Sequence, residues 1–140
     1  MAIYFHVELE GFAIEKETQL RRWLLNVISS ENYQAGEINI IFISNSQILD
    51  LNRAYLKHNY FTDVITFEYN EGNTINGDIF VSIDQVKENA REYTNEFSEE
   101  LMRVMVHGVL HLTGYSDSTP VEQDMMRAKE NEKLRLYKEK

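Results

Sequence analysis

The segment SEELMRVMVHGVLHLTGYSD (residues 98–117) predicts the helix around which the rest of the chain packs. Ser98 can cap its start, and Glu99 and Glu100 are favourable in the first turn. Gly114 stands where the residue after a helix adopts a positive φ and ends it. Apolar residues recur through the segment at the spacing of one helical face: Leu101, Val104, Met105, Val109 and Leu112. We therefore expect a largely buried helix that ends just before the glycine.

Two histidines on this helix have the spacing of metal ligands. His107 and His111 are one helical turn apart and share a face, so both imidazoles can reach one ion. A catalytic zinc site takes three protein ligands and leaves a position for water. The third ligand is expected beyond the chain reversal at the glycine, where Asp117 is favoured over Tyr115 and Ser116. Such pairs also occur by chance in core helices, where backbone groups satisfy the imidazoles.

The residue after the first histidine limits the chemistry of such a site. Zinc proteases of the H-E-x-x-H type carry a glutamate there, which acts as the general base. In this chain the position is Gly108, which offers no side chain for that role. A zinc protease is therefore disfavoured. What remains is a metal-activated water that attacks an ester or amide, with the base or electrophile supplied from elsewhere.

The flanking sequence predicts an α+β fold. Alternating or short apolar segments indicate four strands, at residues 2–9, 38–43, 64–69 and 78–83. Amphipathic or capped segments indicate four more helices, around residues 20–28, from Ser46 as N-cap, at 84–93, and from a Thr119–Glu122 capping box. The loop NEGNTING before the fourth strand has the Asn and Gly of a hairpin. We expect a single domain (1–140) with a mixed sheet of about four strands and about five helices packed on it. The metal site is expected at the end of the central buried helix.

The composition is that of a globular protein with a strong negative charge. The chain has 140 residues, no Cys and a formal net charge of −9. No apolar run approaches the roughly 18 residues of a membrane span. The start of the chain lacks the basic and apolar regions of a signal peptide, so we expect a cytoplasmic location and no membrane partner. An acidic chain repels polyanions, so an RNA partner would require a local basic patch or a cation in a cleft.

Three segments resemble those of a known family. HGVLHLTGYSD (107–117) is similar to the metal-binding signature H-G-x-L-H-L-x-G-Y-D-H of the YbeY family of bacterial rRNA-maturation endoribonucleases. LNRAYLKHNYFTDVITFEY (51–69) resembles the second block of that family, and GDIFVSID (77–84) resembles the third. The likeness in order, spacing and length covers nearly the whole chain, which is thereby identified as a member of the family.

The resemblance implies a zinc-dependent endoribonuclease, specific for single strands, that matures the 3′ end of 16S rRNA and takes part in ribosome quality control. It implies one zinc ion, or another divalent transition metal, with a single-stranded rRNA precursor and the ribosome or ribosomal proteins as partners. The first two family histidines fall on His107 and His111, and the third falls on Asp117. A carboxylate lowers the charge of the site, which makes the bound water less acidic.

A second departure from the family lies at Leu56, where an arginine that acts on the RNA phosphate usually stands. A guanidinium can hold a phosphate oxygen by two hydrogen bonds, and leucine cannot. Arg53, Lys57 and His58 are candidate substitutes, and the first two join the metal ligands as catalytic candidates. Their alternative role is as solvated surface residues. Other cations could contribute to an electropositive cleft: Arg21, Arg22, Lys87, Arg91 and Arg103.

Further residues match the family and are expected to support the fold or the site. Asp63 either caps the start of a strand or accepts a hydrogen bond from a ligand imidazole. Asp78 is expected to be structural, and Gly114 and Tyr115 belong to the turn that presents the third ligand.

Two alternative functions remain open at this point. The arginine-to-leucine change favours a ribosome-biogenesis factor that binds metal and partners but has little catalysis of its own. The expected ligand set also suits a metal-dependent hydrolase of another ester or amide.

Overall fold

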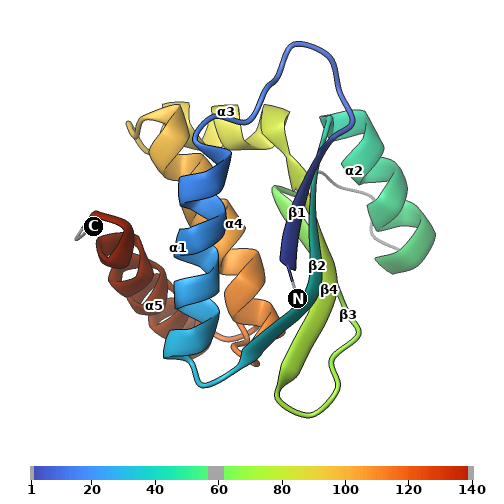
Figure 1. Cartoon of the computed structure of the whole chain (residues 1–140). Helices are drawn as coiled ribbons and strands as arrows, with labels where there is room; N and C mark the ends of the chain where they lie inside the picture. The colour runs from blue at the N-terminus through green and yellow to red at the C-terminus, as the bar shows by residue number, and fades with distance from the viewer. Residues whose placement is uncertain (1, 57–61, 139–140) are drawn as a thin grey trace.

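The structure is a computed structural model that describes residues 2–56 and 62–138. It confirms a single α+β domain with a four-stranded mixed sheet and five α-helices among the described residues (Figure 1). The strands are β1 (Ala2–Val7), β2 (Gln34–Ile43), β3 (Val64–Glu68) and β4 (Thr74–Ser82). The helices are α1 (Glu17–Ser30), α2 (Asn45–Leu51), the π-helical turn η1 (Asn52–Leu56), α3 (Ile83–Glu92), α4 (Phe97–Leu112) and α5 (Pro120–Lys138).

The sheet has the order β1-β2-β4-β3, with β1, β2 and β4 parallel and β3 antiparallel to β4. β3 and β4 form the hairpin that the loop sequence predicts, and a bridge between Glu71 and Thr74 closes its turn. Gly72 has a φ of 58° in this turn, a conformation that glycine adopts at no steric cost. β3 therefore forms one edge of the sheet, and it packs against α4.

The two faces of the sheet are covered by different helices. In Figure 1, α1, α4 and α5 lie on one side of the sheet and α2 lies on the other. Ile40 and Phe42 of β2 belong to the main core. Ile41 and Ile43 of the same strand pack on the opposite face with Ile48 of α2. The apolar run of β2 is therefore that of a strand covered on both faces, as the sequence predicts.

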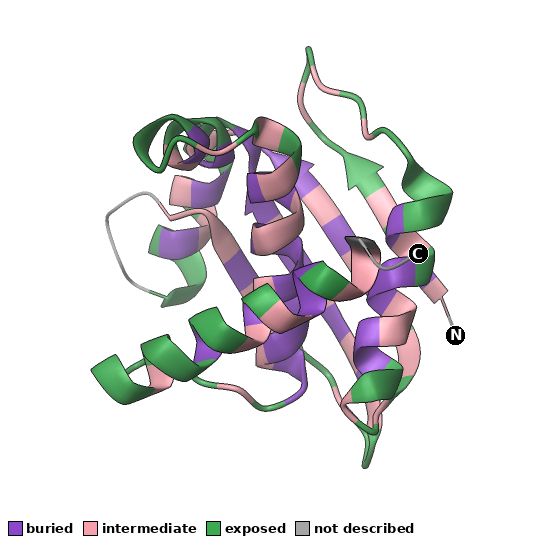
Figure 2. Ribbon diagram, turned by 90° about the vertical axis from the view of Figure 1, so that its left-hand side faces the viewer, coloured by how far each residue is buried: buried purple, intermediate pink, exposed green. Residues whose placement is uncertain are grey.

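α4 lies at the centre of the main core, and nine of its residues are buried (Figure 2). Gly108 faces the sheet: a Cβ there would lie 2.7 Å from Cγ2 of Ile79 and 3.4 Å from Cγ2 of Thr66. The glycine thus allows the helix to approach the sheet closely. A glutamate at this position would point into the sheet, so the fold leaves no room there for the base of a zinc protease.

Two predicted helix starts are wrong by two residues each. The hydroxyl of Ser44, and not that of Ser46, caps α2 by accepting from the backbone N–H of Gln47. The Gln47 side chain accepts in return from the Ser44 N–H, which Ser46 cannot match because the residue three positions after it is apolar. In α4 the N-cap position belongs to Glu96, and Ser98 lies in the first turn.

Helix α5 begins as the sequence predicts. Oγ1 of Thr119 accepts from the N–H of Glu122 at 3.2 Å, and Oε1 of Glu122 accepts from the N–H of Thr119 at 3.0 Å. α5 is also the longest helix, with 19 residues. Neither α5 nor any other helix in the described part of the chain combines the length and the apolar character needed to cross a membrane.

Candidate metal centre

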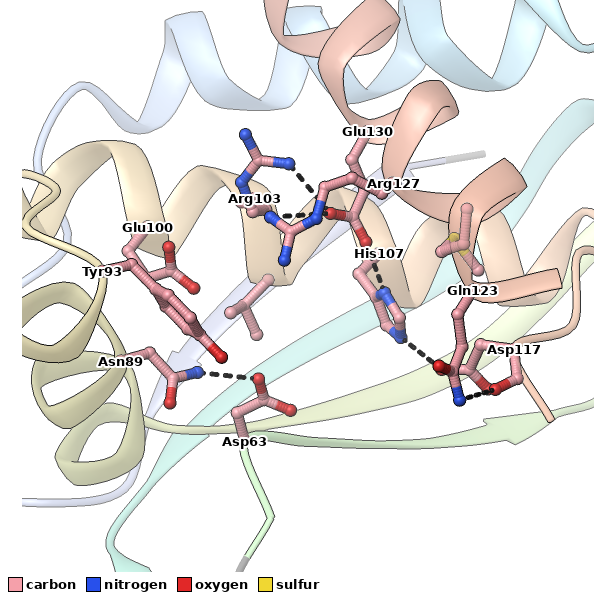
Figure 3. A pocket seen from close by; sticks show the side chains of 12 residues that line it. Asp63, Asn89, Tyr93, Glu100, Arg103, His107, Asp117, Gln123, Arg127 and Glu130 are labelled. Atoms are coloured by element: carbon pink, nitrogen blue, oxygen red, sulfur yellow. Dashed lines mark hydrogen bonds and ion pairs between the residues drawn. The ribbon is translucent and has the colours of Figure 1, made fainter. Parts of the chain in front are cut away.

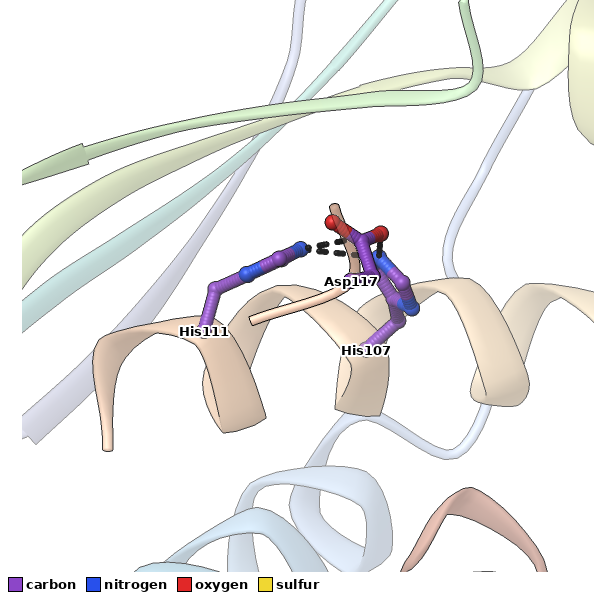
Figure 4. A group of neighbouring side chains, drawn as sticks. All are labelled: His107, His111 and Asp117. Atoms are coloured by element: carbon purple, nitrogen blue, oxygen red, sulfur yellow. Dashed lines mark hydrogen bonds and ion pairs between the residues drawn. The ribbon is translucent and has the colours of Figure 1, made fainter. Parts of the chain in front are cut away.

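The end of α4 brings three candidate ligands together (Figure 4). His107 and His111 project from successive turns, and their Nε2 atoms are 3.0 Å apart. Gly114 ends the helix at a φ of 102°, and the chain then turns back toward both imidazoles. Oδ2 of Asp117 lies 3.2 Å from Nε2 of His107 and 3.5 Å from Nε2 of His111. The three residues expected to hold a metal are therefore neighbours in space.

Each imidazole is oriented by a hydrogen bond at its Nδ1 atom, on the side of the ring away from Asp117. Nδ1 of His107 lies 2.6 Å from Oε2 of Glu130. Nδ1 of His111 donates to the backbone carbonyl of Tyr115 at 3.0 Å. A carbonyl oxygen can only accept a hydrogen bond, so the proton of His111 lies on Nδ1. The carboxylate of Glu130 likewise accepts from Nδ1 of His107, so that proton also lies on Nδ1. Both Nε2 lone pairs therefore face the oxygen of Asp117.

This donor set fits a divalent cation. Two imidazole lone pairs and a carboxylate oxygen separated by 3.0 to 3.5 Å repel one another unless a proton or a metal cation lies among them. Ligand atoms at roughly 2.0–2.1 Å from a tetrahedral zinc ion are about 3.3 Å apart, which agrees with these separations. All three side chains are partly exposed, as a metal site that admits water requires. The cluster could hold one metal ion.

His107 belongs to a buried chain of charges that reaches α5. Nη1 of Arg103 donates to Oε1 of Glu130 at 3.0 Å, while Oε2 of the same carboxylate faces His107. Burial acts to lower the pKa of His107, but the hydrogen bond and charge of Glu130, together with the charges of Asp63 and Asp117, outweigh it and the pKa is raised. Burial acts to raise the pKa of Glu130, but the hydrogen bonds from His107 and Arg103 lower it overall. Glu130 is therefore a carboxylate at neutral pH, and it fixes the ring of His107.

His111 is supported by a second network, which lies behind Tyr115. The hydroxyl of Tyr115 donates to Oε1 of Glu31 at 2.7 Å, and Oε2 of Glu31 pairs with Nζ of Lys133 at 2.7 Å. Lys129 approaches the same carboxylate at 3.5 Å. Burial acts to raise the pKa of Glu31, but the hydrogen bonds from Lys133 and Tyr115 lower it overall. These contacts connect the turn after α4 to both α1 and α5.

The three candidate ligands His107, His111 and Asp117 are here together called the metal cluster. Two clefts meet at this group of side chains, and Asp63, His107 and Asp117 line both clefts. The first, here called the arginine cleft, has a volume of about 280 Å³ (Figure 3). Its lining also includes residues of α4 and α5 and of the α3 region: Asn89, Tyr93, Arg103, Gln123, Arg127 and Glu130. The second, here called the strand cleft, has a volume of about 380 Å³. It runs along η1 and the edge strand β3, and its lining includes Asn52, Leu56, Thr62, Val64, Ile65 and Thr66.

The two aspartates that match the family lie in different places. Asp63 lines both clefts, and its Oδ2 accepts from Nδ2 of Asn89 at 2.9 Å rather than from a ligand imidazole. Asp78 follows a glycine that faces α4, so by alternation its side chain points to the other face of the sheet. There it accepts from Nδ2 of Asn39 at 3.2 Å and from the hydroxyl of Tyr69 at 3.3 Å. Asp63 is thus next to the metal cluster, and Asp78 is not.

The candidate substitutes for the family arginine do not gather at the cluster within the described residues. Leu56 lines the strand cleft, with 43% of its surface exposed. Arg53 is exposed on η1 and is not part of the lining of either cleft. Lys57 and His58 lie outside the described residues. Of the five other cations considered from the sequence, Arg103 is the one that lines a cleft at the cluster.

Glu130 and Arg127 were not predicted, although the sequence holds a signal for the first. Glu130 stands four residues after Met126 and four before Leu134, and both neighbours are buried. A carboxylate in the apolar stripe of a helix requires a buried partner, which points to a functional position. The place of Arg127 depends on how α5 crosses α4, which no local pattern shows.

Fold and cluster together define a class: an α+β domain with a candidate metal centre at the end of its central helix. The family described as Endoribonuclease YbeY matches residues 6–138. The endoribonuclease YbeY of Flavobacterium psychrophilum is 47% identical over 135 residues, which is 96% of each chain. That of Cytophaga hutchinsonii is 44% identical over 137 residues, covering 97% of this chain and 96% of the relative.

A solved structure has a similar fold. The solution structure of TM1509 from Thermotoga maritima matches with a TM-score of 0.67 and 29% identity. The match covers 96% of this chain and 88% of that one. The chain belongs to the endoribonuclease YbeY family, which is consistent with an RNA-cleaving function.

Proposed function

We propose that the protein is a single-strand-specific endoribonuclease that holds one zinc ion, or another divalent transition metal, between His107, His111 and Asp117. Its proposed task is the maturation of the 3′ end of 16S rRNA and ribosome quality control in the cytoplasm. The chain belongs to the endoribonuclease YbeY family, and one observation supports the proposal. The two imidazoles, each anchored through Nδ1, place their Nε2 atoms within 3.5 Å of each other and of Oδ2 of Asp117.

The residues around the centre prepare it for hydrolysis. When bound, the ion supplies a water of lowered pKa and polarises a phosphate oxygen. His107 and His111 keep their Nε2 lone pairs directed inward, because Glu130 and the carbonyl of Tyr115 hold their Nδ1 protons. Asp117 contributes a negative charge where the family signature has a neutral imidazole, so this centre is less positive than a three-histidine site.

The charge of the protein bears on how RNA reaches this centre. A chain with a net charge of −9 repels free RNA at long range. We propose that the ribosome or its proteins deliver the rRNA precursor. Direct contact with the RNA is then confined to the two clefts beside the metal cluster.

A cleavage assay tests the proposed function. Purified protein is incubated, with and without zinc, with a single-stranded RNA that carries the 3′ precursor end of 16S rRNA. The zinc-loaded wild type is expected to cleave it, and His107→Ala to lose cleavage because a ligand is missing. His6→Ala is the matched control, because His6 lies on β1 and bonds to Asn39 away from both clefts. No cleavage by the wild type, or an equal loss in His6→Ala, contradicts the proposal.

Leu56→Arg tests the departure from the family in the same assay. An arginine at this position would enter the strand cleft, whose lining has no Lys or Arg among the described residues. The cleavage rate is expected to rise about tenfold, because a guanidinium stabilises charge that develops on a phosphate oxygen. Leu56→Met is the control for a change of side chain without charge.

Leu56 also favours a second candidate function, a metal-binding ribosome-biogenesis factor with little catalysis of its own. Without an arginine in the strand cleft, the phosphate lacks the cation that the family supplies there. This candidate predicts that the zinc-loaded wild type leaves the RNA intact, while depletion of the protein from cells causes defects in rRNA processing.

A further inference from the structure

We propose that the arginine cleft is a nucleotide-binding subsite, in which Arg127 contacts a phosphate of a single RNA strand and Tyr93 stacks against a base. This rests on the proposed function, because it takes RNA as the substrate. The subsite proposal specifies on which side of the metal cluster the RNA strand is held. It also names an arginine that holds a phosphate in the cleft on the other side of the three candidate ligands from Leu56.

The arginine cleft is continuous with the metal cluster, because His107 and Asp117 form part of its wall. A strand with one phosphate at the cluster has its neighbouring nucleotides in the two clefts. Arg103 and Arg127 line the arginine cleft, whereas no Lys or Arg is found in the described lining of the strand cleft. Contacts between cations and the phosphate backbone dominate affinity for nucleic acids, so the strand is held more firmly on the arginine side.

The two arginines of this cleft have different roles. Arg103 has a side chain that is 15% exposed, and it donates to Glu130 at 3.0 Å and to Asn131 at 2.8 Å. Both of its terminal nitrogens are thus engaged, and one of them contacts the carboxylate that holds His107. Arg127 has a side chain that is 55% exposed, and it approaches Glu130 only to 3.9 Å. That separation is beyond hydrogen-bond distance, so the guanidinium of Arg127 has donors for a ligand.

Carboxylates in the same wall restrict where a phosphate can bind. Asp63 accepts from Asn89 at 2.9 Å, and Glu100 accepts from Asn95 at 3.2 Å. These amides satisfy hydrogen bonds but leave the negative charges in place. A phosphate is therefore attracted only where a cation outweighs them, which is at the guanidinium of Arg127 and at the metal cluster. The charge pattern favours one held phosphate rather than a continuous basic groove.

Tyr93 provides a surface for a base. Figure 3 shows Tyr93 on the α3 side of the cleft and Arg127 on the α5 side. The tyrosine is 55% exposed although it lines the cleft. Proteins recognise single-stranded RNA largely by stacking unpaired bases on aromatic rings. The volume of about 280 Å³ is slightly below the roughly 300–1,000 Å³ of most ligand pockets, so the cleft holds no more than one nucleotide.

Fluorescence anisotropy tests the role of Arg127. Zinc-loaded protein is titrated into a labelled, short single-stranded RNA with phosphorothioate linkages, which resist cleavage, at several salt concentrations. Arg127→Gln is expected to weaken binding about tenfold. The slope of log Kd against log salt should fall by about 0.7, the value for one phosphate contact on a single strand. Arg135→Gln is the matched control, because Arg135 is exposed on the same helix and lines neither cleft.

A pair of substitutions tests Tyr93 in the same titration. Tyr93→Leu is expected to weaken binding about fivefold, because the stacking surface is lost. The salt slope should stay unchanged, since no phosphate contact is removed. Tyr93→Phe keeps the ring and should bind as the wild type does. Equal binding by the leucine and phenylalanine variants excludes stacking at this position.

Zinc affinity, measured for every variant, separates the possible outcomes. Weaker zinc binding by Arg127→Gln overturns the subsite, because the residue would then act through Glu130 and His107. The subsite is also overturned if Arg127→Gln matches Arg135→Gln in Kd and salt slope while the wild type cleaves RNA; the proposed function then stands. If the zinc-loaded wild type neither binds nor cleaves RNA, both proposals fail.

Discussion

His107 and His111 direct their Nε2 atoms to the same point, yet the protein anchors them by different means. His107 is held at 2.6 Å by the side chain of Glu130, which is 23 residues away on another helix. His111 is held at 3.0 Å by the backbone carbonyl of Tyr115, four residues further along the chain. The second anchor depends only on the local turn at Gly114. The first requires α5 to be packed in place.

The two anchors also differ in charge. Glu130 is a carboxylate whose side chain is 7% exposed, with the guanidinium of Arg103 behind it. A buried carboxylate increases the basicity of the imidazole that it contacts more than a neutral carbonyl does. His107 should therefore be the stronger of the two donors, and the one that is more sensitive to substitutions outside the three candidate ligands. Four experiments test this difference, in order of decreasing effect.

The largest effect is expected at the residue that the two histidines share. Asp117→Ala removes the third ligand and should lower zinc affinity by more than about 100-fold, as measured by competition with a chelator. Ser116→Ala is the control, because Ser116 bonds to Glu122 and is not part of the cluster. Equal zinc content in the two variants would remove Asp117 from the ligand set, and with it the common centre on which the comparison depends.

The anchor of His107 should give the next largest effect. Glu130→Gln keeps the shape of the side chain but removes its charge, and zinc affinity should fall by about 10- to 100-fold. Glu132→Gln is the matched control on α5, because Glu132 pairs with Lys129 and Lys133 and not with a histidine. Zinc binding that is unaffected by Glu130→Gln would show that the charged anchor has no advantage.

Acid should weaken the network behind His111 through Glu31. Burial acts to raise the pKa of Glu31, but the hydrogen bonds from Lys133 and Tyr115 bring it below the ordinary value of 4.5. Glu31 therefore contributes stability above about pH 4.5, and this contribution is lost as the pH falls through the folded pKa. Glu31→Gln should lower the free energy of unfolding at neutral pH by about 1 kcal/mol, and should flatten its dependence on pH in acid.

Urea denaturation at a series of pH values measures both parts of that prediction. Glu10→Gln is the control, because Glu10 is exposed. An acid dependence as steep in Glu31→Gln as in the wild type would mean that other carboxyl groups account for it.

The smallest effect is expected from Tyr115→Phe. This change removes the hydroxyl that donates to Glu31 but leaves the carbonyl that holds His111. Zinc affinity should fall by about threefold or less, because a single hydrogen bond of the support is lost. A loss as large as that of Glu130→Gln would contradict the idea that His111 is held by its local turn.

The convergence of the three candidate ligands could be predicted from the sequence because their geometry is local. The helical repeat places His107 and His111 on one face, and a glycine stop returns the chain toward them with Asp117. Glu130 could not be predicted in the same way, since its contact depends on the crossing of α4 and α5. The resemblance to the family located the change at Leu56 but did not indicate Arg127, which lies on the opposite side of the cluster in sequence and in structure.

The fold shows the same division between local and distant information. Apolar periodicity predicts where the strands lie, and the loop composition predicts the β3–β4 hairpin. Neither pattern predicts that β4 lies between β2 and β3, because that strand order depends on pairing between distant segments. The errors at Ser46 and Ser98 have a local cause: several polar residues near a helix start can compete for the N-cap position.

The contact between Gly108 and Ile79 determines how deeply α4 sits on the sheet. A side chain at this position would push the helix outward, since its Cβ would lie 2.7 Å from Cγ2 of Ile79. Both histidines belong to that helix, whereas Asp117 and Glu130 do not. Even an alanine would therefore alter the spacing of the three donor atoms without touching any of them. The geometry of the candidate metal centre thus depends on a missing methyl group on the buried side of the helix.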